Sequence, residues 1–480
     1  MAFINPAPIY RIPTETLDKI LTLAVGMEKE AAATGENGFS TVSWVKKRLV
    51  SQKFRRVLER NQHLWDNVVA FHPDLTALFL TRAANPKVRL RCTNSDKAEK
   101  LFTVLRSFSY KIISLDITIR SAMWVEFCNG QAWNFPKLQR LDLTTYEVGL
   151  PVPPSAVLPI TAPALKDLRA TFLYPSTIET IVSHSQSLER LEIRGNLKMP
   201  ANDVSATLLM VPDLKHLALC ATVKDDNTMH DVALPHLQTL DMAIRSTASA
   251  NVLARLDFPT EATTVIEIEH DDLSSVRDIA RILAPKVNKI VASSQYRKCR
   301  LEHINTSYTK LSFSPAPGAT ARGEAPAEPR LDIIVSAYHD EEEGHVYDAL
   351  AEALRTSLAQ VTELDIEDMD EYNEPGLLPS RHLIGPFPSR LIRVLRFRED
   401  TNRRNGRRPI VVGGWELVCS HLKKLRLSHV RFRPTFLAGN ENDFVELNPR
   451  RRKYPPQGHQ GFEQEDPSRL GLLTGIRAWW

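Results

Sequence analysis

The hexapeptide "LQRLDL" at residues 138–143 and the four similar hexapeptides that follow it decide the fold. Each has the form L-x-x-L-x-φ, where φ is usually a large apolar residue, and successive copies begin 27, 23, 26 and 23 residues apart. The four are "LKDLRA" (165–170), "LERLEI" (188–193), "LKHLAL" (214–219) and "LQTLDM" (237–242). Looser copies lie at 112–117, 263–268, 287–292 and 308–313, and clearer ones return at 361–366, 392–397 and 422–427. The chain therefore repeats one structural unit.

A period of roughly 20 to 29 residues with this motif is typical of leucine-rich repeats. Prolines support the same phase, because a proline precedes the first leucine of four copies by two residues. They are Pro136, Pro163, Pro212 and Pro235. Proline ends a helix and favours extended neighbours, so we expect a turn from helix to strand at each of these sites.

Apolar residues recur at helical spacing between the strands. The sets are Leu101, Leu105 and Phe108, then Val276, Ile279 and Leu283, and finally Val346, Leu350, Leu354 and Leu358. Strands that alternate with helices give an α/β fold with a parallel sheet. One strand and one helix cannot bury their own apolar face, so neighbouring units must stack. We predict a leucine-rich-repeat horseshoe, a solenoid with a parallel sheet, over residues 85–432; the alternative is the core of another α/β fold.

Proline-rich segments interrupt the array. We expect flexible insertions at 314–330 and 371–390, where Pro, Gly and Ala or charged residues replace the apolar pattern. The repeats are lost after about residue 440, and the composition of 440–480 predicts a disordered tail.

Composition places the chain among ordinary soluble proteins. It has 480 residues, of which 43% are hydrophobic and 25% charged, and a net charge of +4 that does not by itself indicate nucleic acid or a membrane as partner. The five cysteines are scattered without a C-x-x-C pair, which favours reduced thiols and a cytoplasmic or nuclear location. No apolar run reaches the ~18 residues of a membrane span, and the first residues do not resemble a secretory signal.

Motifs of enzyme chemistry are absent from the sequence. There is no G-x-S-x-G, no G-x-x-x-x-G-K-[ST] and no H-E-x-x-H. The acidic stretch "HDEEEGH" (339–345) is better explained as a solvated loop than as a metal site, because its histidines lack helical ligand spacing. We expect no catalytic residue, no metal and no cofactor.

The front of the chain reads as two amphipathic helices. In "RIPTETLDKILTLAV" (11–25), Leu17, Ile20 and Leu21 form a stripe on one helix face. A second stripe contains Val50 and Phe54 together with Val57 and Leu58, and Leu64 and Trp65 follow it. We therefore predict a small all-α domain over residues 8–70.

This small domain resembles the F-box motif. Ile12, Pro13, Glu15 and Leu17 match its start, Val50, Ser51 and Arg55 its middle, and Leu64 and Trp65 its end. Phe54 stands where the family usually has tryptophan, and the stretch between the two helices is longer than usual. An F-box followed by irregular leucine-rich repeats resembles the F-box proteins of mushroom-forming fungi.

The resemblance implies a substrate-recognition adaptor of a Skp–cullin–F-box ubiquitin ligase, which is not itself an enzyme. The F-box would bind a Skp-type adaptor and, through it, a cullin, while the repeats hold a protein substrate. The expected adaptor-binding residues are Ile12, Pro13, Leu17, Ile20, Leu21, Val50, Phe54, Leu64 and Trp65. The alternative is that the apolar helix caps the repeat array, as such arrays require.

The expected substrate surface follows from strand alternation. In each L-x-x-L-x-φ strand the apolar residues point into the core, and their neighbours point to the opposite, concave face. The expected substrate-binding residues are Arg140, Asp142, Asp167, Arg169, Arg190, Glu192 and Arg194. The alternatives are a merely solvated face, or recognition by the two insertions.

Arginine-rich stretches suggest a rival function. Residues 390–409 and the tetrapeptide 450–453 are basic, but only Phe397 interrupts the first cluster as an aromatic stacking platform. We therefore favour solvated loops there over a nucleic-acid site. The alternative function is a leucine-rich-repeat scaffold or nucleic-acid-associated protein with no ubiquitin role.

Overall fold

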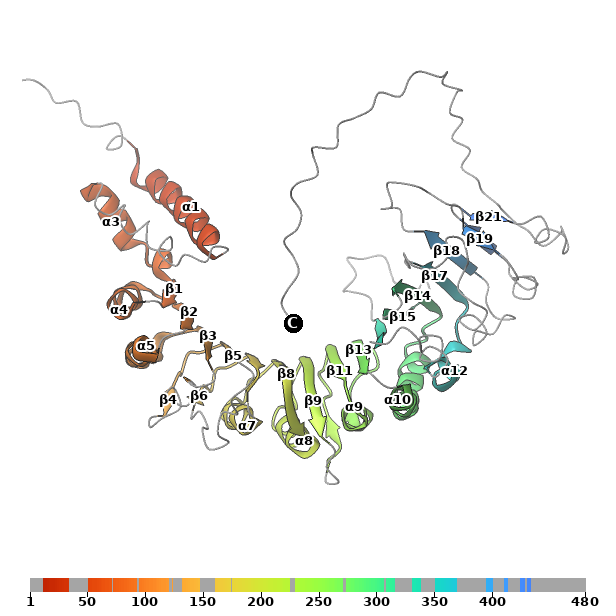
Figure 1. The fold of residues 1–480 in the computed structure, drawn as a ribbon. Helices are drawn as coiled ribbons and strands as arrows, with labels where there is room; N and C mark the ends of the chain where they lie inside the picture. The colour runs from red at the N-terminus through yellow and green to blue at the C-terminus, as the bar shows by residue number, and fades with distance from the viewer. Residues whose placement is uncertain are drawn as a thin grey trace, which may run out of the picture.

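The computed structural model has a mixed α/β fold built on a large, mostly parallel sheet of 15 strands. The residues that it describes are 12–33, 51–70, 72–92, 95–120, 123, 132–146, 160–173, 175–224, 229–270, 273–305, 308–315, 330–337, 350–368, 394–399, 410–412, 424–427 and 430–432. The strands line the inner side of an arc and the helices its outer side (Figure 1). The predicted α/β class with a parallel sheet is confirmed.

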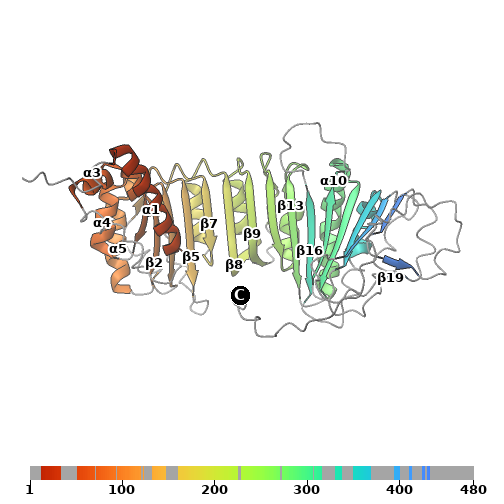
Figure 2. The ribbon, with the colours of Figure 1, turned by 90° about the horizontal axis from the view of Figure 1, so that it is seen from above.

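The first nine strands of the sheet follow the order of the chain and are all parallel. They are β1 (Asn67–Ala70), β2 (Lys87–Cys92), β3 (Ser114–Arg120), β5 (Arg140–Tyr146), β7 (Asp167–Thr171), β8 (Arg190–Pro200), β9 (His216–Lys224), β11 (Thr239–Ile244) and β13 (Thr263–His270). Seen from above, these strands stand side by side with the helices behind them (Figure 2).

The core leucines of successive copies lie in register across these strands. Leu141 pairs with Leu168, Leu168 with Leu191, and the row continues to Leu217 and Leu240. All five are at most 2% exposed. The repeated motif therefore builds one continuous apolar layer, because each copy places its leucine beside that of the next.

Helices cover the outer side of this layer. They are α4 (Pro73–Arg82), α5 (Ser95–Ser107), α7 (Pro175–Ser183), α8 (Ala201–Leu209), α9 (Thr247–Arg255), α10 (Leu273–Ser293) and α12 (Arg355–Leu358), with the 3-10 turn η5 (Ser109–Lys111). The predicted helical stripes are buried, except that Phe108 is partly buried and Val346 lies outside the described residues.

The prolines occupy a common turn at the start of each strand. The carbonyl of the residue before Pro136 accepts a hydrogen bond of 3.2 Å from the Leu138 N–H, and the turns at Pro163, Pro212 and Pro235 repeat this bond. Proline is favoured at the second position of such a turn because its φ is already fixed. Among the described residues directly before these four prolines, a helix is found only at Pro212, where α8 precedes it.

Two-residue strands precede the other three prolines. They are β4 (Trp133–Asn134), β6 (Ile160–Thr161) and β10 (Val232–Ala233); β4 pairs with β6, and β10 with β12 (Leu256–Asp257). A two-residue strand is too short to leave a periodic signal in the sequence, so the apolar residues before these prolines were open to a helical interpretation.

After β13 the spatial order of the strands no longer follows the order of the chain. The remaining strands follow in the spatial order β16 (Leu331–Ala337), β15 (Tyr308–Ser314), β14 (Lys298–Asn305), β17 (Glu363–Asp368), β18 (Val394–Glu399) and β20 (Lys424–Leu427). β15 is antiparallel to both of its neighbours, whereas β13 pairs parallel with β16 and β14 parallel with β17. Farther on, β19 (Ile410–Val412) pairs with β21 (Val430–Phe432) in a sheet of their own.

The prediction of a strand copy at 287–292 is wrong. These residues belong to α10, and Val287, Ile290 and Val291 are buried on its inner side. The spacing of these apolar residues fits a helix face as well as the repeat motif. They form a helix because they continue the helical pattern of the residues before them in α10. Residues 308–313 do form a strand, but an antiparallel one.

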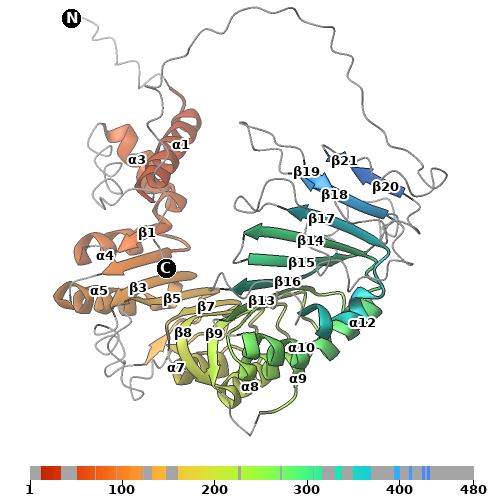
Figure 3. The same ribbon diagram turned by 45° about the vertical axis from the view of Figure 1, so that its right-hand side comes forward.

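Two helices and a 3-10 turn precede the sheet. They are α1 (Thr14–Ala33), α3 (Gln52–Arg60) and η4 (Gln62–Trp65), and they lie at the β1 end of the arc (Figure 3). The predicted insertion at 371–390 and the tail at 440–480 lie outside the described residues, as does 314–330 apart from its two ends, so these remain predictions.

Candidate protein-binding surfaces

The N-terminal helices α1 and α3 pack through one small apolar contact. Leu17 and Leu21 of α1 are 1% and 3% exposed and join the core cluster that contains Val57 and Leu58 of α3. The Asn61 side chain, at the end of α3, donates a 2.8 Å hydrogen bond to Asp18 of α1. Contacts with α3 and Asn61 therefore hold α1 in position without a partner protein.

Trp65 connects this helical unit to the sheet. Its side chain is fully buried, and its Nε1–H donates a 2.8 Å hydrogen bond to the Leu58 carbonyl. The ring centroid lies 5.3 Å from that of Phe79 on α4, and the Arg82 guanidinium lies 4.9 Å above the ring. Arg82 also pairs with Glu59 at 3.3 Å, so α3, η4 and α4 meet around this one indole.

The residues expected to bind an adaptor divide into an inner and an outer group. Leu17, Leu21, Leu64 and Trp65 are buried within the chain, and Ile12 and Phe54 are partly buried. Pro13 and Ile20 are exposed, and Val50 lies outside the described residues.

The exposed part of α1 carries an apolar pair. Ile20 is 48% exposed and Leu23 is 69% exposed. Leu23 was not among the expected residues, although it lies three positions after Ile20 and hence on the same helix face. Ile20 lies at the edge of the stripe that contains Leu17 and Leu21, and Leu23 lies beyond it, so the contact that buries the two leucines leaves this pair toward solvent.

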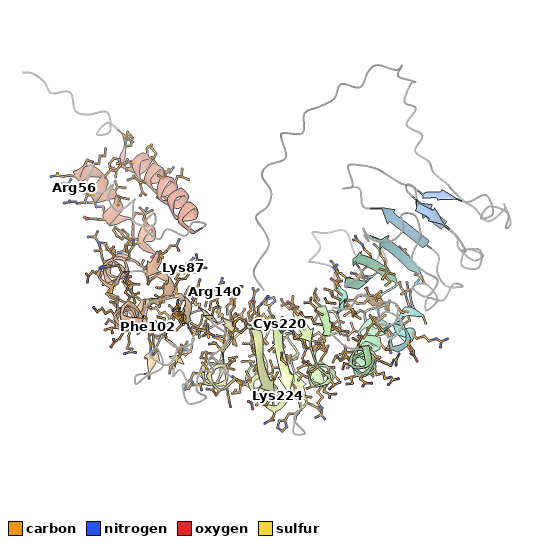
Figure 4. All side chains as sticks on the ribbon, viewed as in Figure 1. Arg56, Lys87, Phe102, Arg140, Cys220 and Lys224 are labelled. Carbon is orange, nitrogen blue, oxygen red and sulfur yellow. The ribbon has the colours of Figure 1, made fainter. Side chains whose placement is uncertain are left out.

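The second surface is the inner face, which we define as the side of strands β2 to β13 opposite the helices. Lys87, Arg140 and Cys220 lie along it, whereas Phe102 lies among the helices (Figure 4). The predicted alternation is confirmed on the described residues of these strands: every second residue is buried and its neighbours are half-buried or exposed, except at the bulge of β8 and at the end of β11, where Ala243 is buried as well.

All seven residues expected to bind substrate lie on the inner face, and the register brings them side by side. Arg140 pairs with Asp167, and Asp167 with Arg190, in one row of the sheet. Two positions along the strands, the second row runs through Asp142, Arg169 and Glu192, and Arg194 follows in a third row.

Ion pairs join these rows. Arg169 lies 3.4 Å from Glu192 and 3.7 Å from Asp167, while Arg140 lies 3.8 Å from Asp167 and 3.9 Å from Asp142. Arg194 also pairs with Glu192, at 2.5 Å. Such a network orients the arginine side chains before any partner arrives, although exposed pairs of this kind add little to stability.

Several carboxyl groups on the inner face are partly buried, which disfavours their ionised form and raises their pKa. Burial raises the pKa of Asp142, and the nearby Asp116 carboxylate raises that pKa further. Burial likewise raises the pKa of Asp241 on β11 and the pKa of Glu267 on β13. The thiol of Cys220 stands on the neighbouring strand β9, and burial raises its pKa to about 11, so it is protonated at neutral pH.

Basic residues at the β2 end extend the surface beyond the expected set. Lys87, Arg89 and Arg91 of β2 are exposed, as is Arg120 of β3, and Arg89 donates a 3.0 Å hydrogen bond to Asp116. The alternation of "KVRLRC" (87–92) is the signal that marks this strand, although it lacks the first leucine of the repeat motif.

Within the described ranges, no group of three or more His, Cys, Asp or Glu side chains is arranged to hold a metal ion. The "HDEEEGH" stretch lies outside those ranges. Among the helices described, none has the length and apolar character needed to cross a membrane.

Comparison with known proteins identifies no family for this chain, so a proposal about its function has to rest on its sequence and geometry. No protein-family model matches the chain, and no curated protein matches it either.

Proposed function

We propose that the chain is the substrate-recognition subunit of a Skp–cullin–F-box ubiquitin ligase, acting in the cytoplasm or nucleus. In this proposal an F-box-like unit ending at Trp65 binds a Skp-type adaptor. The repeats that follow form a leucine-rich-repeat solenoid whose inner face holds the substrate. The chain performs no chemistry of its own; it brings a substrate near an enzyme that others supply.

The observation that carries this proposal is the exposed apolar pair Ile20 and Leu23 on a helix that is otherwise fixed. Interface energy is concentrated in a few apolar anchors, and a rigid helix presents such anchors at little entropic cost. A partner that offers an apolar groove would cover both side chains in one contact.

A pull-down with a purified Skp-type adaptor tests the proposal. Ile20→Asp places a carboxylate in the apolar contact, so adaptor capture should fall by at least about tenfold. Leu209→Asp is the matched control, since Leu209 on α8 is equally exposed, at 48%, but lies on the outer side of the sheet. Equal capture of wild type and a folded Ile20→Asp variant would rule out adaptor binding through this face.

A second candidate function is a repeat scaffold without a ubiquitin role, in which the N-terminal helices serve only as a cap. The burial of Leu17, Leu21 and Trp65 favours this candidate, because a cap must cover the open end of a repeat array. Co-expression separates the two. The adaptor should raise the yield of monomeric protein if α1 needs a partner, and leave it unchanged if α1 is a cap.

A further inference from the structure

The inner face carries an excess of positive charge at one end. Of the side chains that the structure describes on this face of strands β2 to β8, eight are cationic and four are anionic. The cations are Lys87, Arg89, Arg91, Arg120, Arg140, Arg169, Arg190 and Arg194, and the anions are Asp116, Asp142, Asp167 and Glu192. The following strands β9 to β13 do not continue this excess, because they bring the carboxylates Asp241, Glu267 and Glu269.

Every one of the four carboxylates already has an arginine beside it. Asp116 pairs with Arg89, and the other three share Arg140, Arg169 and Arg194. Among the described residues, Lys87, Arg91 and Arg190 have no carboxylate within ion-pair distance. The surplus charge therefore belongs to identifiable side chains that have no intramolecular counterion.

Arg140 adds donor capacity to this surplus. Its two ion pairs, at 3.8 and 3.9 Å, are longer than hydrogen bonds, and its side chain is 47% exposed. A guanidinium offers five N–H donors in a planar fork that fits a carboxylate. Asp142 and Asp167 thus hold Arg140 in place without occupying its donors, which remain available to an incoming acid.

We propose that an acidic, extended segment of a protein partner crosses strands β2 to β8 on the inner face, with its carboxylates bound by Lys87, Arg91, Arg140 and Arg190. Lys87 and Arg190 are separated by four strand spacings, about 19 Å, which about six residues of extended chain would cover. The identification of this partner as a ubiquitination substrate rests on the proposed function. The acidic character of the segment is inferred from the inner face alone and is independent of that function.

A protein segment fits this surface better than a nucleic acid does. The four carboxylates lie between the cations in the same rows, where they would repel a continuous phosphate backbone but could alternate with spaced acidic side chains.

Fluorescence anisotropy with the full-length chain tests the proposal. The probes are a labelled 12-residue peptide of alternating Glu and Ser, the same peptide with Lys in place of Glu, and a 12-nucleotide oligouridylate. We expect the Glu peptide to bind best, and its binding to weaken as the salt concentration rises. Preference for the oligouridylate, or equal binding of the Glu and Lys peptides, would overturn the proposal.

Charge reversal locates the site. Lys87→Glu with Arg91→Glu removes no core atom and no ion pair with a described residue, and it should weaken binding of the Glu peptide at least about tenfold. The matched control is Lys100→Glu with Arg277→Glu, two exposed cations on the outer helices α5 and α10, which should leave binding unchanged. Equal weakening by both double variants would mean that only net charge matters, and would overturn the assignment to the inner face.

An adaptor pull-down on the same proteins separates this inference from the proposed function. The Lys87→Glu/Arg91→Glu variant should retain the adaptor and lose the peptide, whereas Ile20→Asp should do the reverse. Peptide binding without any adaptor binding by the wild type would remove the ubiquitin role and leave the acidic partner in place.

Discussion

The ring of Phe172 occupies the space where residue 195 would carry a side chain. A Cβ on Gly195 would lie 2.6 Å from Cδ1 of Phe172. Both residues have positive φ, 58° at Phe172 and 123° at Gly195. The Phe172 N–H donates a 2.9 Å hydrogen bond to the Arg194 carbonyl, and its own carbonyl accepts one from the Thr145 hydroxyl. Phe172 thus joins three neighbouring strands where β7 ends and β8 bulges.

Gly195→Ala should therefore destabilise the protein by about 2–4 kcal/mol, because strained backbone and a steric overlap add at one position. Urea unfolding measures the change. Phe172→Ala in the same chain removes the overlap, so the double variant should lose less than the sum of the two single changes. Strict additivity would mean that the ring and the glycine are not in contact.

The strand pattern was predictable from the sequence because each copy repeats both the leucines and their phase. Leu141, Leu168 and Leu191 each stand three residues after the first leucine of their copy, so pairing them requires no other information. The direction of β15 was not predictable. Period-two alternation is the same for a strand and its reverse, and only the short link from β14 forces residues 308–314 to run backwards.

The candidate surfaces were predictable to different degrees. The inner face follows from alternation, but its ion pairs depend on register, and the basic β2 end lies outside the clear copies. For α1, the sequence shows that Leu17, Ile20 and Leu21 share one helix face. It does not show that α3 covers the two leucines and leaves Ile20 at 48% exposure, because a stripe fits an internal or an external partner equally well.

Gln186 stands where four other copies have proline, two residues before the first leucine. It is exposed, and its N–H makes no hydrogen bond to a described residue, while Ser185 before it bonds to Val182 just as Val211 before Pro212 bonds to Leu208. Gln186→Pro should stabilise the protein by about 0.4–1 kcal/mol by restricting the unfolded chain.

Thermal unfolding checks this, with Gln238→Pro as the control. The Gln238 N–H donates a 2.8 Å hydrogen bond to Lys215, so that variant should be less stable than wild type. A loss of stability in Gln186→Pro would show that its turn differs from the proline turns.

Trp65→Ala should detach the N-terminal helices from the sheet. The indole fills the junction of α3, η4 and α4, and large-to-small changes at such sites cost about 3–5 kcal/mol. Hydrogen exchange should lose protection in α3 while β8 keeps it, because stability in a stacked array is mostly local. Trp65→Phe keeps a ring but gives up the hydrogen bond to Leu58, so its effect should be about 1–2 kcal/mol. Unchanged protection of α3 in Trp65→Ala would exclude this junction as its anchor.

The half-buried carboxyl group of Asp241 should make stability depend on pH in a definite direction. Burial is the main cause that raises its pKa in the folded state; Glu192 adds to the effect and Arg194 opposes it. The folded protein therefore holds the proton more tightly than the unfolded chain, and the ionised form weakens folding at neutral pH. Asp241→Asn removes the ionisation, so it should raise the free energy of unfolding at pH 7, by at most about 1 kcal/mol because solvent screens a partly exposed group. The stability advantage of Asp241→Asn should shrink as pH falls through the raised pKa, and should vanish below the ordinary value of 3.8.

Glu269→Gln is the matched control, since Glu269 accepts a 2.6 Å hydrogen bond from Arg245 and its neutralisation should destabilise the protein at pH 7. Urea midpoints of the three proteins at several pH values decide the matter; a benefit of Asp241→Asn that persists at pH 3 would show that packing, not charge, is its cause.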